Sequence, residues 1–576
     1  MGDLGHTDDL FRLYFTANNH AERDYFALLK ELVALRNQHQ PKSQAHIYIQ
    51  NKINRVYDLI LDEITTNQSQ PVNRVKFGTS GWRGIIGKDL FIKSIQQVTM
   101  AIVDMYLEAA GSPSLSDNLG VRDIDEARRR GVVLGFDNRF GNEVFAKAIS
   151  TVLTGNGFTV HYAAEATTGI LSAAVLELKA ACSINLTPSH NPLDYGGFKF
   201  NAADGGPAQP VITDYITRQA NKLIKQGSVP RATADNSLQQ PCNAMAHWQS
   251  LVRKGKTSHN LDYDAILKHL NSRDDIAVTV DCVHGSSKSS IKDFFLNSQP
   301  EFLSFFRTSA DPTFGGIAPE PTAANMARVK STLAQSRKPL KLGVIMDPDA
   351  DRIRFTDGTT DIDMNHFGAM SYHFLHEGKG LKGMVAKTVA TSNFVNAIAK
   401  SFHEEIFEPR VGFKEFKPVI DKALVCFEES DGMTVRGHTP EKDAYIGLLL
   451  ALDLILSTNK NLGTYLSELQ EKYGCYFPSK DSVSVSRKGD VLLDTLAQLD
   501  KYHPGTSLKV GGREHLIERM INIDGHKIIL DDGSWLMIRP SGTEPKVRFY
   551  VEARSAAATE DLFTCARDLL AEIGLA

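Results

Sequence analysis

Short apolar runs alternate with amphipathic stretches three times along this chain, and this alternation most constrains its fold. "RGVVLGFDNR" predicts a buried strand that ends in a polar loop. "GNEVFAKAISTVLTGNG" predicts a helix ended by Gly155 or Gly157, and "FTVHYA" predicts the next strand. The same order returns in "DIAVTVDCVHGSSKSSIKDFFLN" and in "GMVAKTVATSNFVNAIAKSF". The sequence therefore predicts repeated βαβ units and an α/β fold.

The two ends of the chain differ from this pattern. Residues 1–70 carry apolar side chains at helical spacing, as in "DYFALLKELVALRN". The last hundred residues alternate like half-exposed antiparallel strands and end in an amphipathic helix, which predicts an α+β domain. At 576 residues the chain is long enough for several domains. The predicted units are a helical extension, three α/β domains and an α+β domain, at residues 1–70, 71–225, 240–340, 341–465 and 470–576.

Composition and charge exclude several classes of partner. The formal net charge is −4, so no bulk basic field would attract nucleic acid. The longest apolar run, residues 446–456, is short and contains Asp453, which predicts a buried helix and not a membrane span. The N-terminus lacks a secretory pattern, and no two of the six cysteines stand at CxxC spacing. We expect a cytoplasmic protein.

Three aspartates follow an apolar strand in "MDPDADRIR". Asp347, Asp349 and Asp351 can converge on one cation in a tight loop. Carboxylates without His or Cys favour a hard divalent ion, best Mg²⁺. A solvated acidic turn or a calcium loop is the alternative, but Arg352 stands where an EF-hand needs glycine. The sequence favours a magnesium site.

A second motif, "RPSGTEPKVRFY", predicts a phosphate-binding loop. Arg539, Ser541 and Thr543 alternate around Gly542 between two predicted strands. A guanidinium, hydroxyls and loop N–H groups suit a phosphate dianion. Because Pro-Ser-Gly is also common turn chemistry, an ordinary turn is the alternative at this point.

Three further stretches carry weaker signals. "VKFGTSGWRG" brings Arg83 beside small residues but lacks the Lys-Ser/Thr ending of a P-loop. "CFEESDG" offers Glu428 and Ser430 for sugar hydroxyls, although a charged loop is the simpler reading. "VGFKEFK" offers Lys414 as a phosphate partner.

Ser189 lies in "TPSHNP" and could be a turn residue or a nucleophile. There is no GxSxG elbow, so the logic of a hydrolase triad does not apply. A serine is a poor nucleophile unless it is activated. A serine beside a metal that also holds a phosphate could nevertheless carry a phosphoryl group.

Five motifs together resemble the α-D-phosphohexomutase family, which includes phosphoglucomutase and phosphomannomutase. They are "FGTSGWRG", "TPSHNP" followed by "GGFKFN", "DPDADR", "EES" and "RPSGTEP", and they occur in the family's order over about residues 71–576. The resemblance implies related α/β domains with mixed sheets and a C-terminal domain round a central cleft. The first α/β domain would carry the phosphoserine loop, the metal loop would open the third, and the C-terminal domain would bind phosphate.

The resemblance also implies roles for individual residues. Ser189 matches the phosphorylated serine and would complete a Mg²⁺ site with Asp347, Asp349 and Asp351. Arg83, Lys199 and Arg352 match basic residues around the transferred phosphoryl, and His190 matches the residue that follows the serine. Lys199 is the first candidate for the general acid/base. Glu428 and Ser430 match the loop that binds the sugar hydroxyls. The residues matching the loop that holds the other phosphate of the substrate are Arg539, Ser541, Gly542 and Thr543, and Lys414 is the further candidate named above.

The chain departs from the family pattern at several places. Trp82 stands where relatives often have His or Leu, and the 70-residue extension is unmatched. The "EES" loop continues "DG" where phosphomannomutase-like members have "GH", so a histidine acid/base is missing there. "PEKDA" resembles a "KD" element of phosphoglucomutases, so Lys442 could serve instead, with His190 as a third candidate.

The implied activity is an isomerase that interconverts glucose 1-phosphate and glucose 6-phosphate through phosphoserine and glucose 1,6-bisphosphate. Phosphomannomutase, dual mutase and pentose-phosphate mutase are the alternatives within the class. A non-catalytic regulatory or scaffold member and a phosphatase are the alternatives outside it. The expected partners are small sugar phosphates and not nucleic acid or membrane, and the protein is expected to be a monomer or a homodimer.

Overall fold

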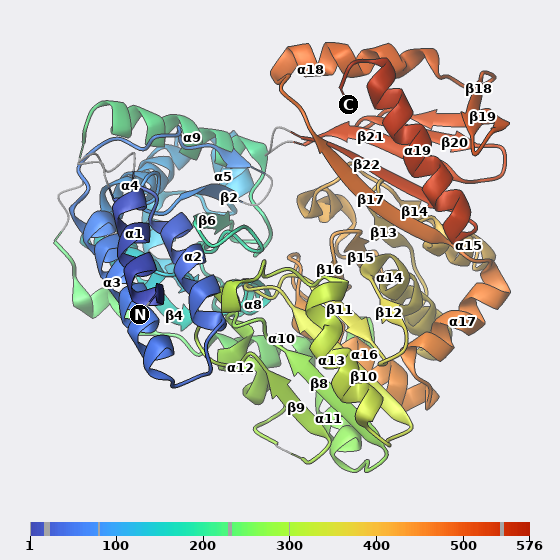
Figure 1. The fold of residues 1–576 in the computed structure, drawn as a ribbon, viewed down its shortest axis with the longest axis horizontal. Coiled ribbons are helices and arrows are strands. Elements are labelled where there is room, and N and C mark those ends of the chain that lie inside the picture. The colour runs from blue at the N-terminus through green and yellow to red at the C-terminus, as the bar shows by residue number, and fades with distance from the viewer. Residues whose placement is uncertain are drawn as a thin grey trace.

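The computed structural model of the chain describes residues 2–15, 23–78, 81–228, 233–298, 300–541 and 546–575, with side chains from Thr7 onward. Its described strands form four sheets of seven, five, four and six strands. Figure 1 shows the blue N-terminal helices and the first sheet at the left, the mainly green second body below, and the red C-terminal body at the upper right. The predicted α/β domains with mixed sheets, the C-terminal α+β domain and the helical N-terminal region are confirmed. The central cleft stays a prediction.

Three helices precede the first sheet: α1 (Gly2–Tyr14), α2 (Tyr25–Asn37) and α3 (Gln44–Thr66). Asp24 and Ser43 cap α2 and α3, because their side chains accept hydrogen bonds from backbone N–H groups of the first turn. The apolar faces of the helices share one core with the first α/β domain. The extension is therefore a layer on that domain.

The first sheet has the order β1-β2-β6-β5-β3-β4-β7. Its strands β3, β4, β5 and β7 pair in parallel, whereas β6 runs antiparallel to β5 and β2. The strands are β1 (Phe77–Gly78), β2 (Gly81–Ile85), β3 (Val132–Phe136), β4 (Val160–Glu165), β5 (Cys182–Leu186), β6 (Tyr195–Asn201) and β7 (Gln239–Pro241). The helices are α4 (Ile92–Ala109), α5 (Pro113–Leu119), α6 (Ile124–Arg130), α7 (Asn142–Gly155), α8 (Thr168–Leu178), α9 (Pro210–Lys225) and the short η2 (Asn236–Leu238).

The second sheet has the order β12-β11-β10-β8-β9. The strands are β8 (Ile276–Asp281), β9 (Leu303–Phe306), β10 (Leu340–Met346), β11 (Ile353–Thr356) and β12 (Asp361–Ile362). The helices are α10 (Ala244–His259), α11 (Tyr263–Asn271), α12 (Ser287–Phe294), η3 (Phe314–Gly316) and α13 (Ala323–Gln335).

Two predicted domain limits need correction. The predicted limit at residues 340/341 assigned β10 to the third domain, but β10 pairs in parallel with β8 and antiparallel with β11. The acidic loop between β10 and β11 therefore belongs to the second sheet, because neighbouring strands and not sequence order decide membership. Similarly, β7 overlaps the predicted start at 240 but pairs with β4 of the first sheet.

The third sheet has the order β14-β13-β15-β16. The strands are β13 (Val385–Lys387), β14 (Ile406–Phe407), β15 (Val425–Glu428) and β16 (Gly432–Val435). The helices are α14 (Met364–His373), η4 (Phe374–Gly378), α15 (Phe394–Ser401), η5 (Phe413–Val419), α16 (Ala444–Thr458) and α17 (Leu462–Tyr473). Residues 444–456 of α16 are all buried, which confirms the predicted core helix. Among the described residues no helix is long and apolar enough to span a membrane.

The fourth sheet is antiparallel, with the order β17-β22-β21-β20-β19-β18. The strands are β17 (Phe477–Ser484), β18 (Ser507–Val510), β19 (Arg513–Ile521), β20 (His526–Leu530), β21 (Trp535–Pro540) and β22 (Lys546–Ala553). The helices are α18 (Gly489–Leu496), η6 (Ala497–Lys501) and α19 (Ala556–Glu572). This domain has its own core, and a small apolar cluster that includes Trp535 and Val389 joins it to the third domain.

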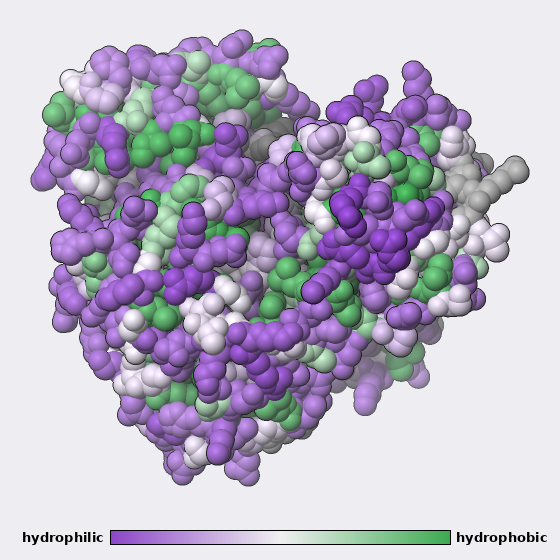
Figure 2. Space-filling model, turned by 180° about the vertical axis from the view of Figure 1, so that it is seen from behind, coloured by the Kyte–Doolittle hydropathy of each residue, from purple (hydrophilic) through white to green (hydrophobic). Residues whose placement is uncertain are grey.

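The surface and the cysteines have simple features. The face opposite to that of Figure 1 is mostly hydrophilic, with apolar residues scattered between polar ones (Figure 2). All six cysteines are free thiols. Cys475 is exposed, Cys242 is half-buried, and the other four are buried.

Candidate active site

Ser189 lies on a tight loop directly after β5, a fully buried strand inside the first sheet. Its φ is +60°, a conformation that L-residues other than glycine rarely adopt. The Ser189 backbone N–H donates to Thr187 Oγ1 at 2.9 Å, and only 1% of the residue is exposed. The serine is therefore held on a strained, buried turn and not on a flexible loop.

Arg139 holds this loop through hydrogen bonds to its backbone, and the sequence did not predict this residue. Its guanidinium donates to the carbonyl oxygens of Ser189 at 2.9 Å, of Pro192 at 2.5 Å and of Asn191. Burial lowers the pKa of Arg139 to about 10 although Asp137 lies nearby, so the side chain stays charged near neutral pH. The only sequence signal is an arginine in the polar loop after β3, at the same sheet edge as the serine.

The acidic loop is folded by its own first aspartate. Asp347 Oδ1 accepts hydrogen bonds from the backbone N–H groups of Asp351 at 3.1 Å and Arg352 at 3.0 Å. Ala350 takes a φ of +47°, which lets β10 turn back into β11. The fold of this loop therefore brings its three carboxylates together.

The loop meets the serine. Ser189 Oγ donates to Asp347 Oδ2 at 2.7 Å, across 158 residues of sequence. One carboxylate oxygen from each of Asp347, Asp349 and Asp351 lies within 4.8 Å of the others, and all three residues are buried. Burial, together with its two acidic neighbours, raises the pKa of Asp347 well above its usual value.

The aspartates fit a hard divalent cation. Asp349 Oδ1 and Asp351 Oδ1 are buried and have no hydrogen-bond partner among the residues that the structure describes. Buried carboxylate oxygens without a partner are costly unless a cation or another donor satisfies them. An all-oxygen set with a hydroxyl at its edge matches the donors that Mg²⁺ prefers.

Lys199 bridges the same carboxylates from β6. Its Nζ donates to Asp349 Oδ2 at 2.6 Å and to Asp351 Oδ2 at 3.0 Å. Burial disfavours the ammonium, but the attraction of these two carboxylates outweighs it, so the pKa of Lys199 is raised. Lys199 is therefore a positive charge placed beside the serine and the aspartates.

Thr168 is a second residue that the sequence analysis missed. It opens α8, and its Oγ1 donates to Asp349 Oδ2 at 2.7 Å while its backbone N–H donates to the Asp349 carbonyl at 2.9 Å. Asn185 Nδ2 donates to Thr168 Oγ1 at 3.0 Å. The first domain thereby fixes the orientation of an aspartate from the second domain.

The third sheet adds Lys442, Glu428 and Ser430. Lys442 Nζ lies 3.3 Å from Asp351 Oδ2 and 3.4 Å from Glu428 Oε1. Ser430 Oγ donates to Glu428 Oε1 at 2.7 Å. Burial opposes the charge of Lys442, but the two carboxylates raise its pKa. Ionic contacts of Lys442 therefore join Glu428 to Asp351, and a hydrogen bond adds Ser430.

Glu441 is a third residue missed from the sequence. It accepts a hydrogen bond from Asn201 Nδ2 at 3.2 Å, and burial raises the pKa of this carboxyl to about 7. Asp443, two residues later, accepts a hydrogen bond from Trp248 Nε1 at 2.5 Å, and its carboxylate lies 2.7 Å from His438 Nε2. These buried contacts fix the loop that carries Lys442.

Three other predicted residues lie round the serine. His190 Nδ1 is 3.2 Å from Ser189 Oγ, and Arg352 Nε is 3.8 Å from Asp351 Oδ1. Arg83 lies on β2 directly opposite Gly197 of β6. Burial and then the charges of Arg352 and Arg83 lower the pKa of His190 well below its usual value, so the ring is neutral. Arg352 and Arg83 therefore lie close enough to act on the residue next to the serine.

The predicted residues for the second phosphate lie on other elements. Arg539 is the next-to-last residue of β21 and pairs with Asp524 at 3.0 Å, within its own domain. The Ser541 backbone N–H donates to the Lys546 carbonyl at 2.8 Å, whereas Gly542 and Thr543 lie outside the described residues. Lys414 is half-buried in η5. The structure therefore places Arg539 and Ser541 on the C-terminal domain and Lys414 on the third.

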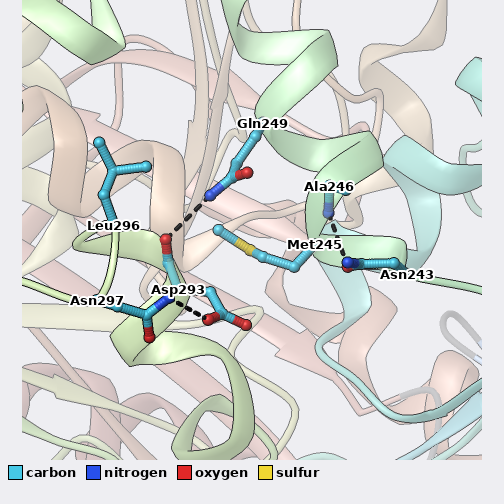
Figure 3. Close-up of a pocket in the computed structure, with 7 residues that line it drawn as sticks. All are labelled: Asn243, Met245, Ala246, Gln249, Asp293, Leu296 and Asn297. Carbon is cyan, nitrogen blue, oxygen red and sulfur yellow. Dashed lines mark hydrogen bonds between the residues drawn. The ribbon is translucent and has the colours of Figure 1, made fainter.

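A cavity of about 300 Å³ lies elsewhere, between α10 and the end of α12 (Figure 3). It is lined by Asn243, Met245, Ala246, Gln249, Asp293, Leu296 and Asn297. Its polar groups are paired with one another: Gln249 Nε2 donates to the Asp293 carbonyl, and Asn297 Nδ2 donates to the Asp293 carboxylate. No predicted site residue lines it, so this cavity is not the candidate site.

Comparison with known proteins gives consistent matches along the chain. Family models for the phosphoglucomutase/phosphomannomutase α/β/α domains I, II and III match residues 74–227, 256–360 and 363–473, and the model for the C-terminal domain matches residues 488–568.

Individual relatives are distant. A phosphoglucomutase from Komagataeibacter xylinus is 25% identical, over 90% of this chain and 95% of its own. A phosphoglucosamine/phosphogalactosamine mutase from Sulfurisphaera tokodaii is 24% identical, over 84% and 97%. A crystal structure from Thermus thermophilus, provisionally named a phosphomannomutase, matches with a TM-score of 0.69 at 24% identity, over 87% and 99%.

Proposed function

Because the chain belongs to the phosphoglucomutase/phosphomannomutase family and is a phosphohexomutase, we propose that it interconverts glucose 1-phosphate and glucose 6-phosphate. Phosphoserine 189 would be the carrier and glucose 1,6-bisphosphate the intermediate. The "KD" element at Lys442 and Asp443 and the named phosphoglucomutase relative support this choice of sugar. Family membership also favours an enzyme over the non-catalytic scaffold considered from the sequence.

The contact between Ser189 and Asp347 carries the proposal. A serine hydroxyl 2.7 Å from one carboxylate of a buried acidic triad is placed where a phosphoryl group would need cations. Arg83, Lys199 and Arg352 supply fixed positive charge round it. When bound by Asp347, Asp349 and Asp351, Mg²⁺ would neutralise charge on the transferring phosphoryl group.

The first half-reaction moves one phosphoryl group. The bond between Ser189 Oγ and phosphorus breaks, and a bond forms between phosphorus and the free sugar hydroxyl oxygen. The hydroxyl proton passes to a general base, and Ser189 Oγ takes a proton from a general acid. The product is the 1,6-bisphosphate and a bare serine. In the second half, the other phosphoryl group returns to Ser189 Oγ, which gives up its proton, and the sugar oxygen that the phosphoryl group leaves takes a proton.

Lys199 is our first candidate for this proton exchange. It reaches both Asp349 and Asp351 beside the serine, and its raised pKa keeps it protonated, which suits the step that gives a proton to a leaving oxygen. His190 and Lys442 are the other candidates, since the first lies 3.2 Å from Ser189 Oγ and the second 3.3 Å from Asp351. A neutral His190 is suited to accept a proton.

The remaining residues would hold the substrate. We assign the sugar hydroxyls to Glu428 and Ser430, whose side chains already bond to each other. We assign the second phosphate to Arg539, Ser541, Gly542, Thr543 and Lys414. Because the bisphosphate must present either end to Ser189, this set has to accept the sugar in both orientations.

A substrate panel tests the choice of sugar. The panel compares kcat/KM for the 1-phosphates of glucose, mannose, glucosamine and a pentose, with Mg²⁺ and glucose 1,6-bisphosphate present. We expect glucose 1-phosphate to lead. A higher value for mannose or glucosamine 1-phosphate would replace the substrate and keep the mechanism. Release of inorganic phosphate without isomerisation would indicate a phosphatase.

A further inference from the structure

The N-terminal helices lie against the loop that carries Arg139. The Tyr57 ring of α3 packs on the Phe140 ring, with centroids 4.5 Å apart. Farther along the same helix, Ile64 packs on Gly141, whose φ is +82°. A Cβ built at Gly141 would come within 2.8 Å of Ile64 Cδ1, so this close contact depends on the glycine.

The same helices also lie against a loop of the second domain. Val33 of α2 packs on Gly316, where an added Cβ would come within 3.0 Å of Val33 Cγ1. Figure 1 shows the blue helices beside the yellow-green segment that contains this glycine. The phenyl ring of Phe314, in the same segment, faces the Arg139 guanidinium at 4.8 Å. The two loops are joined directly by Asn138 Nδ2, which donates to the Asp311 carbonyl at 3.4 Å.

A third contact reaches the strand of Arg83. Glu63 is a buried carboxylate on α3 that accepts hydrogen bonds from Tyr25 and from Asn67. Asn67 Nδ2 also donates to the carbonyl of Gly87, in the turn that follows β2. The N-terminal helices therefore contact the turn after the strand of Arg83 as well as the loop of Arg139.

Ser189 needs such support for a physical reason. A serine at a φ of +60° keeps this conformation only where its surroundings over-determine it. Arg139 supplies three of those restraints, through the carbonyls of Ser189, Asn191 and Pro192. Arg139 is itself placed by Phe314 on one side and by a backbone that continues into Phe140 on the other.

We propose that residues 25–67 are a brace that positions the Ser189 loop for phosphoryl transfer, with Tyr57 and Ile64 as positioning residues that act through Phe140, Gly141 and Arg139. The inference rests on the proposed function of Ser189 as the phosphoryl carrier. It gives the extension, which lies outside the matched family models, a role at the active site.

The central variant is Tyr57→Ala, which removes the ring from Phe140. The conservative variant is Tyr57→Phe, because the Tyr57 hydroxyl is buried without a hydrogen-bond partner among the described residues and the ring alone packs. The matched control is Tyr48→Ala on the same helix. Tyr48 lies nine residues earlier, on the opposite face of α3, where it packs near Lys52.

Two measurements are made on the full-length enzyme: steady-state kcat and KM, and backbone hydrogen exchange of residues 187–195 without substrate. In Tyr57→Ala, kcat should fall about tenfold or more with KM nearly unchanged, because small displacements of a reacting group cost large factors in rate. Exchange in residues 187–195 should quicken. Tyr57→Phe should restore both values, and Tyr48→Ala should change neither.

The brace would be overturned if Tyr57→Ala had the same kcat and the same exchange rates in residues 187–195 as the wild type. It would also be overturned if Tyr48→Ala lost as much kcat as Tyr57→Ala. If Tyr57→Ala does not fold, Tyr57→Leu keeps apolar volume without the ring and answers the same question. Exchange does not depend on turnover. A wild type without mutase activity would therefore contradict the proposed function and leave the exchange comparison valid as a test of the brace.

Discussion

The centre round Ser189 and the proposed phosphate-binding residues of the C-terminal domain are built in opposite ways. At the centre, three sheets meet and their side chains bond directly: Ser189 to Asp347, Lys199 to Asp349, and Lys442 to Asp351. All these residues are buried. Arg539, in contrast, is half-buried and pairs with Asp524 of its own domain.

The C-terminal domain contacts the third domain through a small apolar cluster round Trp535 and through hydrogen bonds. Lys527 donates to the Val389 carbonyl and Lys480 to the Glu429 carbonyl, whereas Glu552 and Asp524 accept from the backbone N–H groups of Asn393 and Val411. Arg539 itself pairs within its own domain, so we expect the proposed contact with the second phosphate to be less rigid than the contacts round Ser189. Changes at the centre should therefore act on kcat, and changes in the C-terminal domain should act on KM.

The largest expected effect is that of Ser189→Ala at the centre. Without the hydroxyl no phosphoryl group can be carried, so kcat should fall by at least about 10³-fold. A coupled assay that follows glucose 6-phosphate measures it. Ser183→Ala, at a buried serine on β5, is the matched control and should keep nearly wild-type kcat. Near-wild-type turnover in Ser189→Ala would remove the serine from the mechanism.

The next effect is that of Arg139→Lys. A lysine cannot donate to three carbonyls at once in the geometry of a guanidinium, so the serine loop should shift and kcat should fall roughly 10²-fold. Arg130→Lys is a close control: Arg130 also donates to three carbonyls, those of Gly120, Lys179 and Ala180, but at the other end of β3. Both kcat and the melting temperature are measured for each variant. A similar fall in kcat at a similar fall in melting temperature would mean that Arg139 acts only on stability.

A smaller effect is expected from Arg539→Ala in the C-terminal domain. Loss of one charged hydrogen-bond donor to phosphate should raise KM by about 10- to 100-fold. The kcat at saturating substrate should change far less. Arg519→Ala, at an exposed position on β19 of the same sheet, should leave both constants unchanged. A fall in kcat with an unchanged KM would mean that Arg539 acts on phosphoryl transfer and not on substrate binding. The centre and the C-terminal domain would then not differ in the constant that they affect.

The smallest expected effect is on the pH dependence of stability, through Lys527, which attaches the C-terminal domain to the third domain. Burial and then the charge of Lys387 lower the pKa of Lys527 to about 7, although Glu408 and Glu552 oppose this. Between about pH 7 and the pKa of an unfolded lysine, about 10.4, the unfolded chain binds the extra proton, so stability should rise with pH. Below about pH 7 both states are protonated and the slope vanishes.

Lys527→Met tests this sign. The free energy of unfolding, measured from pH 6 to 10 by denaturant titration, should rise less steeply with pH in the variant than in the wild type. The difference in slope should not exceed about 1.4 kcal/mol per pH unit, the value for one proton. Parallel curves would mean that Lys527 keeps an ordinary pKa in the folded protein.

Much of the centre could be predicted because each of its parts is a local motif. Three aspartates at alternate positions after an apolar strand indicate a cation site, and the serine, Lys199 and the "KD" element stand in short recognisable stretches. The α/β repetition likewise predicts the fold class, because periodicity is local. These signals do not require knowledge of which strands are neighbours.

The missed features all depend on contacts distant in sequence. Arg139 lies 50 residues from Ser189, and Thr168 lies 181 residues from Asp349. Glu441 meets Asn201 across 240 residues. The misplaced limit at residues 340/341 has the same cause, since the membership of β10 depends on its pairing with β8. Residue types in loops do not specify such partners.

The most direct test of the account is to follow the phosphoryl group itself. Wild-type enzyme is incubated with Mg²⁺ and glucose 1,6-bisphosphate labelled with ³²P on phosphorus, freed of ligand, and digested for peptide mapping. The account predicts label on Ser189, release of that label into unlabelled glucose 1-phosphate on a chase, and no label in Ser189→Ala. Label on another residue, or label on Ser189 that the sugar phosphate does not remove, would contradict it.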